Sequence, residues 1–197
     1  MSQYICVDIG GTSIKHGVLD ENAIIKECNQ TKTEAWLGGA AVLDKVKTIG
    51  KQYKEQYENI EGICISTAGM VDPEEGKIVF AGELMPDYTG TCIKKELEKA
   101  LEMPCEVEND VNCAGLAEYV SGSAKESHIM FCATVGTGIG GCAIVNGRVF
   151  HGASNSACEV GYIPMGDSDF QTLGASSILV RKVAEKKIEP LDMWDGK

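Results

Sequence analysis

The sequence lacks most of the features that would place it in a specialised class of protein. Its 197 residues contain only five prolines and 6% aromatic residues. There is no signal peptide, no apolar run of membrane-spanning length and no block of basic residues. The net charge is −11, so we expect neither nucleic acid nor an anionic membrane as a partner. The acidity itself is typical of a soluble protein.

Disulfide and zinc frameworks are also missing, although the chain has nine cysteines. The number is odd, and no Cys-x-x-Cys pair occurs. Free thiols in apolar runs behave as small hydrophobic side chains. We therefore expect reduced thiols, a cytoplasmic location and no zinc site. Five of the nine lie in apolar, strand-like runs: Cys6, Cys64, Cys105, Cys132 and Cys142.

What remains is the composition of a globular protein, 44% hydrophobic and 24% charged. The length permits one large domain or two small ones. A chain of this size buries roughly 70% of its unfolded surface, so a hydrophobic core forms without cross-links.

The stretch from Tyr4 to Gly17 organises the chain. Tyr4 to Val7 and Ser13 to Leu19 predict two strands, joined by a tight turn at Gly10 and Gly11. By themselves the two glycines indicate an ordinary hairpin.

The residues that flank this turn favour a phosphate-binding loop. Glycines allow the backbone to approach a ligand, and successive N–H groups form an anion nest. Thr12 and Lys15 add a donor and a positive charge. Asp8 could hold a metal ion through water.

The next elements predict an α/β sheet with a crossover. Ala23 to Cys28 reads as a third strand, Ala40 to Tyr57 as an amphipathic helix, and Gly62 to Ser66 as a buried strand. The turn from Ser66 to Pro73 follows a strand carboxyl end, where α/β proteins bind ligands. A plain connecting turn explains these residues equally well.

Polar residues gather again after the sixth predicted strand. Lys77 to Phe80 and Cys105 to Glu108 read as strands, with a helix from Cys92 to Leu101 capped by Thr91. Asn109, Asp110 and Asn112 then precede a helical pattern over 113–119. Three amide or acid side chains in four positions exceed what a helix cap requires.

The C-terminal third repeats the strand–turn–strand pattern. The run from His128 to Thr134 leads into Gly136, Thr137 and Gly138, and a strand follows over 142–145. Asn146-Gly147 predicts a two-residue hairpin turn before a return strand at 149–150. The polar loop 122–127 is the expected lobe boundary, and 173–187 reads as a helix.

Five motifs, in order, resemble those of the ROK (repressor, open reading frame, kinase) sugar kinases, which have the actin-like ATPase fold. One such motif is a weak signal, whereas five in order are specific. The motifs are Asp8-x-Gly10-Gly11-Thr12-x-x-Lys15-x-Gly17, Ala68-Gly69-x-Val71-Asp72, Glu108-Asn109-Asp110-Val111-Asn112, Gly136-Thr137-Gly138-Ile139-Gly140, and Gly152-Ala153-Ser154 leading to Glu159-x-Gly161.

The resemblance implies a two-lobed α/β protein with mixed sheets (actin-like, ribonuclease H-like). Residues 1–121 would form the N-terminal lobe and 122–197 a partial C-terminal lobe. ATP and Mg²⁺ would be bound, with the phosphates between the two glycine hairpins. Asp110 would accept the proton of a sugar hydroxyl that attacks the γ-phosphate.

The resemblance also assigns binding residues. Phosphate or nucleotide contacts would come from Asp8, Gly10, Gly11, Thr12, Lys15, Gly136, Thr137 and Gly138. Asp8 would also bind Mg²⁺, directly or through water. Sugar contacts would come from Ala68, Gly69, Asn109, Asp110, Glu159 and Tyr162.

The sequence departs from the family pattern at several points. The family's zinc motif is missing, and Tyr162 stands where a histidine is usual. Ala68 replaces a proline and Cys158 a glycine. The chain is shorter than its relatives, so we expect a truncated second lobe.

Two alternatives to a kinase are a sugar-responsive regulator and a non-catalytic sugar-binding remnant. Regulators of the family carry an N-terminal helix-turn-helix, whereas the first strand here begins at Tyr4, and basic charge is lacking. The sequence does not identify the sugar, although the loop 81–84 is expected to select it. Because members of the family are often dimers, the resemblance also suggests a homodimer.

Overall fold

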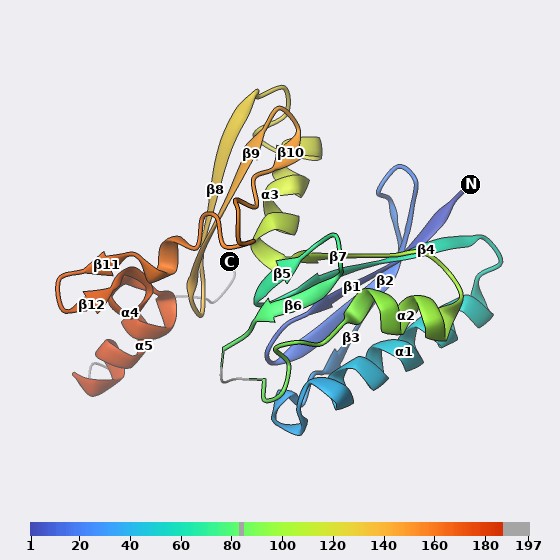
Figure 1. Ribbon diagram of the computed structural model, residues 1–197, viewed down its shortest axis with the longest axis horizontal. Helices are drawn as coiled ribbons and strands as arrows, with labels where there is room; N and C mark the ends of the chain where they lie inside the picture. The colour runs from blue at the N-terminus through green and yellow to red at the C-terminus, as the bar shows by residue number, and fades with distance from the viewer. Residues whose placement is uncertain (83–84, 187–197) are drawn as a thin grey trace, which may run out of the picture. The chain divides into compact units, whose positions relative to one another are not determined.

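The computed structural model describes residues 1–82 and 85–186, which form an α/β protein (Figure 1). Contacts between Cα atoms divide the chain into two compact units, Met1–Cys113 and a second that begins at Ala114. The sequence-based boundary between lobes, after residue 121, stays a prediction. Among the described residues, no helix combines the length and the apolar character that crossing a bilayer requires.

The first unit is built on a five-stranded mixed sheet in the order β3-β2-β1-β4-β7. Strand β1 is antiparallel to β2 and parallel to β4, which is in turn parallel to β7. The carboxyl ends of β1, β4 and β7 therefore lie at one edge of the sheet. The strands are β1 (Gln3–Ile9), β2 (Ser13–Asp20), β3 (Ile25–Lys32), β4 (Ile60–Thr67) and β7 (Cys105–Asn109).

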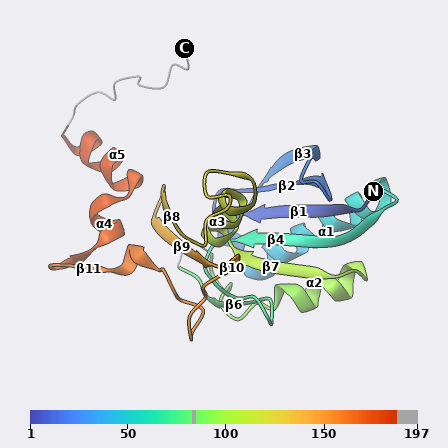
Figure 2. The same cartoon turned by 90° about the horizontal axis from the view of Figure 1, so that it is seen from above.

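Two helices cover one face of this sheet, as Figures 1 and 2 both show. They are α1 (Gly39–Gln56) and α2 (Ile93–Leu101), the first preceded by the 3₁₀ helix η1 (Ala35–Leu37). The small hairpin of β5 (Met70–Asp72) and β6 (Lys77–Phe80) lies between β4 and α2 in the chain. Because α1 and α2 pack against the sheet, the apolar side of each helix is removed from water.

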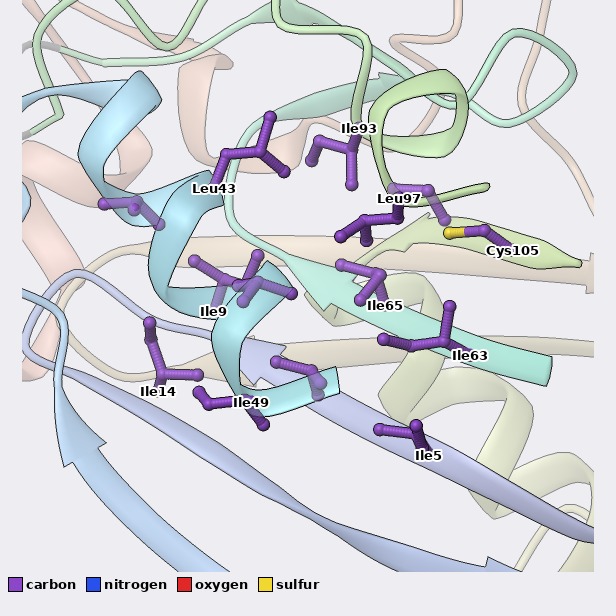
Figure 3. Close-up of a cluster of buried hydrophobic side chains, with 14 of the residues drawn as sticks. Ile5, Ile9, Ile14, Leu43, Ile49, Ile63, Ile65, Ile93, Leu97 and Cys105 are labelled. Atoms are coloured by element: carbon purple, nitrogen blue, oxygen red, sulfur yellow. The ribbon is translucent and has the colours of Figure 1, made fainter. Parts of the chain in front are cut away.

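The core of the first unit lies between the helices and the sheet. Side chains alternate between the two faces of a strand, so Ile5, Val7 and Ile9 of β1 are buried. Isoleucines of β1 and β4 meet side chains of α1 and α2 there (Figure 3). The intervening residues of β1, including Cys6 and Asp8, belong to the opposite face.

The second unit contains a small sheet in the order β10-β9-β8. Its antiparallel strands are β8 (Ile129–Val135), β9 (Ile139–Val145) and β10 (Arg148–Val149). Asn146 and Gly147 have φ of 49° and 79°, which confirms the predicted hairpin turn. The remaining elements are α3 (Asp110–Ser121), which begins in the first unit, η2 (Val160–Tyr162), β11 (Pro164–Met165), β12 (Ser168–Asp169), α4 (Phe170–Gly174) and α5 (Ser176–Glu185).

The helix expected over 173–187 is instead two helices. Ala175, with ψ of 150°, interrupts the pattern between α4 and α5. The apolar periodicity continues through this break, so the sequence pattern gave no warning of it. Lys187 and the residues after it lie outside the described part of the chain.

Three other expectations for the first unit were wrong in detail. Helix α2 has Cys92 at its N-cap with no side-chain cap bond, so Thr91 is not the cap. The third strand begins at Ile25, because Ala23 has a φ of 59° and belongs to the turn. Cys64 is exposed rather than buried, because it points away from the helices.

The packing of α2 provides a test of the core. Leu97 has 0% exposure, so Leu97→Ala should lower the free energy of unfolding by about 3 kcal/mol through lost burial and a residual cavity. Lys95→Ala, on the exposed side of the same helix, should change it by less than about 0.5 kcal/mol. Urea unfolding of both variants measures the difference, and equal losses would contradict this packing.

Candidate functional site

Predicted site residues of the first unit meet at the edge where β1, β4 and β7 end. Asp8 lies near the end of β1, Ala68 and Gly69 follow β4, and Asn109 ends β7. The Ala68 N–H donates to the Ile9 carbonyl at 3.3 Å and ties the two strand ends together. A proline at position 68 could not make this bond.

Asp8 belongs to a row of polar residues that crosses the sheet. In register, Lys15 pairs with Asp8, Asp8 with Ser66, and Ser66 with Glu108. The Ser66 hydroxyl donates to Asp8 Oδ1 at 2.7 Å. This bond fixes the orientation of the carboxylate. Among the described residues, Asp8 Oδ2 makes no hydrogen bond of its own.

The first glycine turn is open where a ligand would approach it. Neither Gly10 nor Gly11 has a positive φ, so the backbone conformation does not demand glycine. A Cβ at Gly11 would meet no atom within 4 Å. In the described part of the chain, the N–H groups of Gly11 and Thr12 have no intramolecular acceptor. Two free donors beside open space suit an anion.

Gly69, in contrast, is required by the fold itself. Its φ is +100°, and a Cβ there would lie 2.7 Å from the Phe80 carbonyl oxygen. The close approach brings the β5–β6 hairpin against the end of β4. It also leaves the Gly69 carbonyl free to accept from Asn109 Nδ2 at 2.9 Å.

The side chain of Asn109 is fully engaged within the protein. Its Nδ2 donates to the Gly69 carbonyl and, at 3.0 Å, to Asp110 Oδ1. Its Oδ1 accepts the N–H groups of Val111 at 2.9 Å and Asn112 at 3.1 Å. A primary amide has two donors and two acceptor positions. Asn109 therefore caps α3 and orients Asp110 at the same time.

Asp110 is the first residue of α3, so the helix begins three residues before the predicted start. Its Oδ1 accepts the Val111 N–H at 2.9 Å in addition to the Asn109 amide. Although Asp110 is exposed at the surface, desolvation of its carboxyl by neighbouring groups raises the pKa of Asp110, and the negative charge of Asp8 raises it further. The hydrogen bonds oppose this shift but do not cancel it. Asp8 and Asp110 are thus electrostatically coupled.

The second glycine turn, in the second unit, is tied back by the start of α5. The Gly136 N–H closes the turn by donating to the Gly138 carbonyl at 2.9 Å. The Ser176 N–H donates to the Gly136 carbonyl at 3.0 Å, and the Ser177 hydroxyl to the Thr137 carbonyl at 2.7 Å. A Cβ at Gly136 would meet no atom within 4 Å.

The glycines after this turn let another segment cross β9 closely. A Cβ at Gly141 would lie 2.6 Å from the Cys158 carbonyl oxygen. One at Gly161 would lie 2.2 Å from the Ile139 carbonyl oxygen. The segment that carries the predicted sugar contacts Glu159 and Tyr162 is therefore held against the strand that leaves the turn. Glu159 is half-buried and Tyr162 exposed.

Cys158, which departs from the glycine usual in the family pattern, has a φ of 65°. This left-handed conformation costs a non-glycine residue about 1 kcal/mol or more. The structure thus explains why a glycine is favourable at this position.

Some residues at these sites were missed from the sequence. Gln171 of α4 places Oε1 beside both Gly138 and Gly161, and so connects the turn to the predicted sugar segment. Ser66 and Ser177 were noted only as parts of a turn and a helix. Their partners lie 58 and 40 residues away, so no local pattern could indicate them.

Metal ligands do not cluster in the structure. Across residues 1–82 and 85–186, no group of three or more His, Cys, Asp and Glu side chains is arranged to hold a metal ion. The selectivity loop expected at 81–84 is only partly described, since Glu83 and Leu84 lie outside the described residues.

Comparison with known proteins identifies relatives over nearly the whole chain. The model of the ROK family matches residues 4–175. An uncharacterized protein of Clostridium perfringens is 49% identical over the full chain, which spans 66% of it. A glucokinase of Streptomyces coelicolor is 32% identical over 84% of the chain and 50% of its own length.

Solved structures agree with this match. The ROK glucokinase of Streptomyces griseus, in complex with glucose and AMPPNP, has a TM-score of 0.82 and 27% identity. The alignment covers 94% of this chain and 61% of that one. The chain thus spans between half and two thirds of the length of its relatives. The predicted actin-like α/β fold class is confirmed.

The raised pKa of Asp110 has a consequence for stability. The unfolded chain ionises this carboxyl more readily, so the ionised form is penalised in the folded state at pH above the folded pKa. Asp110→Asn retains an Oδ1 acceptor and should raise the free energy of unfolding at pH 7. The gain should vanish below about pH 3, where the carboxyl is protonated in both the folded and the unfolded state. Urea unfolding at several pH values measures it, and a gain independent of pH would contradict the assignment.

Proposed function

The chain belongs to the ROK family, and we propose that it transfers the γ-phosphoryl group of ATP to a hydroxyl of a hexose or hexose derivative. The observation that carries the proposal is the position of Asp110, on the strand-end edge that also bears Asp8 and the open glycine turn. The names of the relatives support it: one is a glucokinase, and a similar structure holds glucose and an ATP analogue.

The first glycine turn would bind phosphate oxygens. The free N–H groups of Gly11 and Thr12 supply donors, and Lys15, exposed on β2, supplies positive charge. Asp8 would hold Mg²⁺, directly or through water, because a carboxylate oxygen is the ligand this cation prefers. Bound Mg²⁺ would neutralise negative charge on the phosphates. The turn Gly136-Thr137-Gly138 would bind the same nucleotide from the second lobe.

Asp110 would accept the proton of the attacking hydroxyl. Phosphoryl transfer depends on positioning and charge neutralisation more than on a strong base. The raised pKa moves this carboxyl toward neutral pH, which improves a general base as long as it remains ionised. Asn109 orients it through the hydrogen bond to Oδ1.

Sugar contacts are proposed for residues of both units. Ala68 and Gly69 would line the sugar with backbone atoms, and Glu159 and Tyr162 would contact hydroxyls from the second unit. Since every hydrogen-bonding position of Asn109 is engaged, a direct bond to sugar would require it to exchange one of these partners. Its contribution through Asp110 needs no such exchange.

The test is phosphoryl transfer by the purified chain, with ATP, Mg²⁺ and a panel of hexoses. Asp110→Asn should lower kcat by about 10²–10⁴-fold while sugar binding, measured by calorimetry, persists. Asp44→Asn, an exposed carboxylate on α1, is the matched control and should be fully active. Retained turnover in Asp110→Asn refutes the assigned role. Sugar binding without ATP binding by the wild-type chain would favour the non-catalytic remnant.

Gly11→Ala separates ligand binding from folding. The added methyl group meets no protein atom within 4 Å, so the free energy of unfolding should not fall. It would, however, occupy the space through which a phosphate approaches, and the Kd for Mg·ATP should rise by roughly tenfold or more, about 1.4 kcal/mol. Calorimetry and urea unfolding measure the two effects. Unchanged affinity would remove the turn from the phosphate site.

A further inference from the structure

Thr33 is one of three buried polar or charged residues in the described chain, and no motif includes it. It follows β3 directly and has 0% exposure. A hydroxyl without access to water needs a protein partner, because burying it unpaired is costly. Its partners identify what the residue does.

Both hydrogen-bonding groups of Thr33 reach the first glycine turn. The Thr33 hydroxyl donates to the Gly10 carbonyl at 2.6 Å. The Thr33 N–H donates to the Thr12 carbonyl at 3.1 Å. One residue, 23 positions from Gly10 in the chain, thus holds the carbonyl groups at the two ends of the turn.

The bonding pattern divides the groups of the turn by type. The carbonyls of Gly10 and Thr12 are directed to Thr33, whereas the N–H groups of Gly11 and Thr12 have no acceptor within the described residues. With these two carbonyls held by Thr33, the turn offers the N–H groups of Gly11 and Thr12 to an anion. Such an arrangement is preorganised, because binding would not have to reorient the backbone.

Thr33 is itself fixed from the other side by α1. Lys45 Nζ donates to the Thr33 carbonyl at 3.0 Å and to the Lys32 carbonyl at 3.2 Å, and it also pairs with Glu34. The hydrogen bonds therefore run without interruption from the turn, through Thr33, to a helix of the core.

We infer that Thr33 is a positioning residue for the phosphate turn, which it holds in the anion-binding conformation without contacting the ligand. The role in binding rests on the proposed function. The mechanical role, which is to hold the turn, rests only on the hydrogen bonds above, and the two are measured separately.

The mechanical role is tested by amide hydrogen exchange, followed by NMR without any ligand. Thr33→Val is nearly isosteric but removes the hydroxyl. The amides of Gly10 and residue 33, both hydrogen-bonded in the turn, should exchange roughly fivefold to tenfold faster, while amides of β4 and β7 keep their rates. Thr33→Ser retains the hydroxyl and should restore slow exchange. Thr48→Val, which removes a hydroxyl from the exposed side of α1, should leave the turn unchanged.

Exchange that is unaltered at the turn, or accelerated equally across the sheet, overturns the inference, because the second result would show only a general loss of stability. If Thr33→Val does not fold, Thr33→Ser and Thr33→Ala are compared in its place. Failure of Thr33→Ser to restore slow exchange also counts against it.

The binding role is tested by calorimetry with Mg·ATP. Thr33→Val should raise the Kd by roughly fivefold to tenfold, and Thr33→Ser should leave it near the wild-type value. An unchanged Kd in Thr33→Val overturns the binding role. If the wild-type chain itself binds no Mg·ATP, the proposed function fails for this chain, whereas the exchange experiment still decides whether Thr33 holds the turn.

Discussion

The alternation of side chains along three parallel strands is the constraint on which the first unit depends. On β1, β4 and β7 the residues that face the helices are apolar and form the core, while their neighbours carry the polar row. A shift of one residue in register would exchange the two sets. The register of β1 therefore fixes the burial of Ile9 and the position of Asp8 together. The packing that stabilises the core thus also fixes the positions of the carboxylates in the polar row, including that of Asp8.

Glycine serves three different purposes in this chain. At Gly69 it permits a left-handed backbone beside the β5–β6 hairpin. At Gly141 and Gly161 it allows two backbone segments to come closer than any side chain would permit. At Gly11 and Gly136 no protein atom requires it, and the space it leaves faces solvent. Motifs that read alike in sequence are thus partly structural and partly open to ligands.

Much of the fold could be read from the sequence, because periodicity and turn residues are local signals. The strands around Asp8, the helix over 40–57 and the Asn146-Gly147 turn all follow from such signals. The division at Ala175 did not, because apolar spacing continued across it. The predicted site residues came from motif order. The groups that orient them, Ser66, Thr33 and Gln171, act over long sequence separations, and only the folded chain reveals them.

Asn109 gives the strand-end edge a chemical weakness. Asparagine is among the thermolabile residues, and hydrolysis of its amide to a carboxylate would leave no donor for the Gly69 carbonyl or for Asp110 Oδ1. Both attractive contacts would become repulsive, and a further negative charge would be added beside Asp8 and Asp110. Loss of this amide would therefore disturb the strand-end edge while the buried core of the first unit keeps its own contacts.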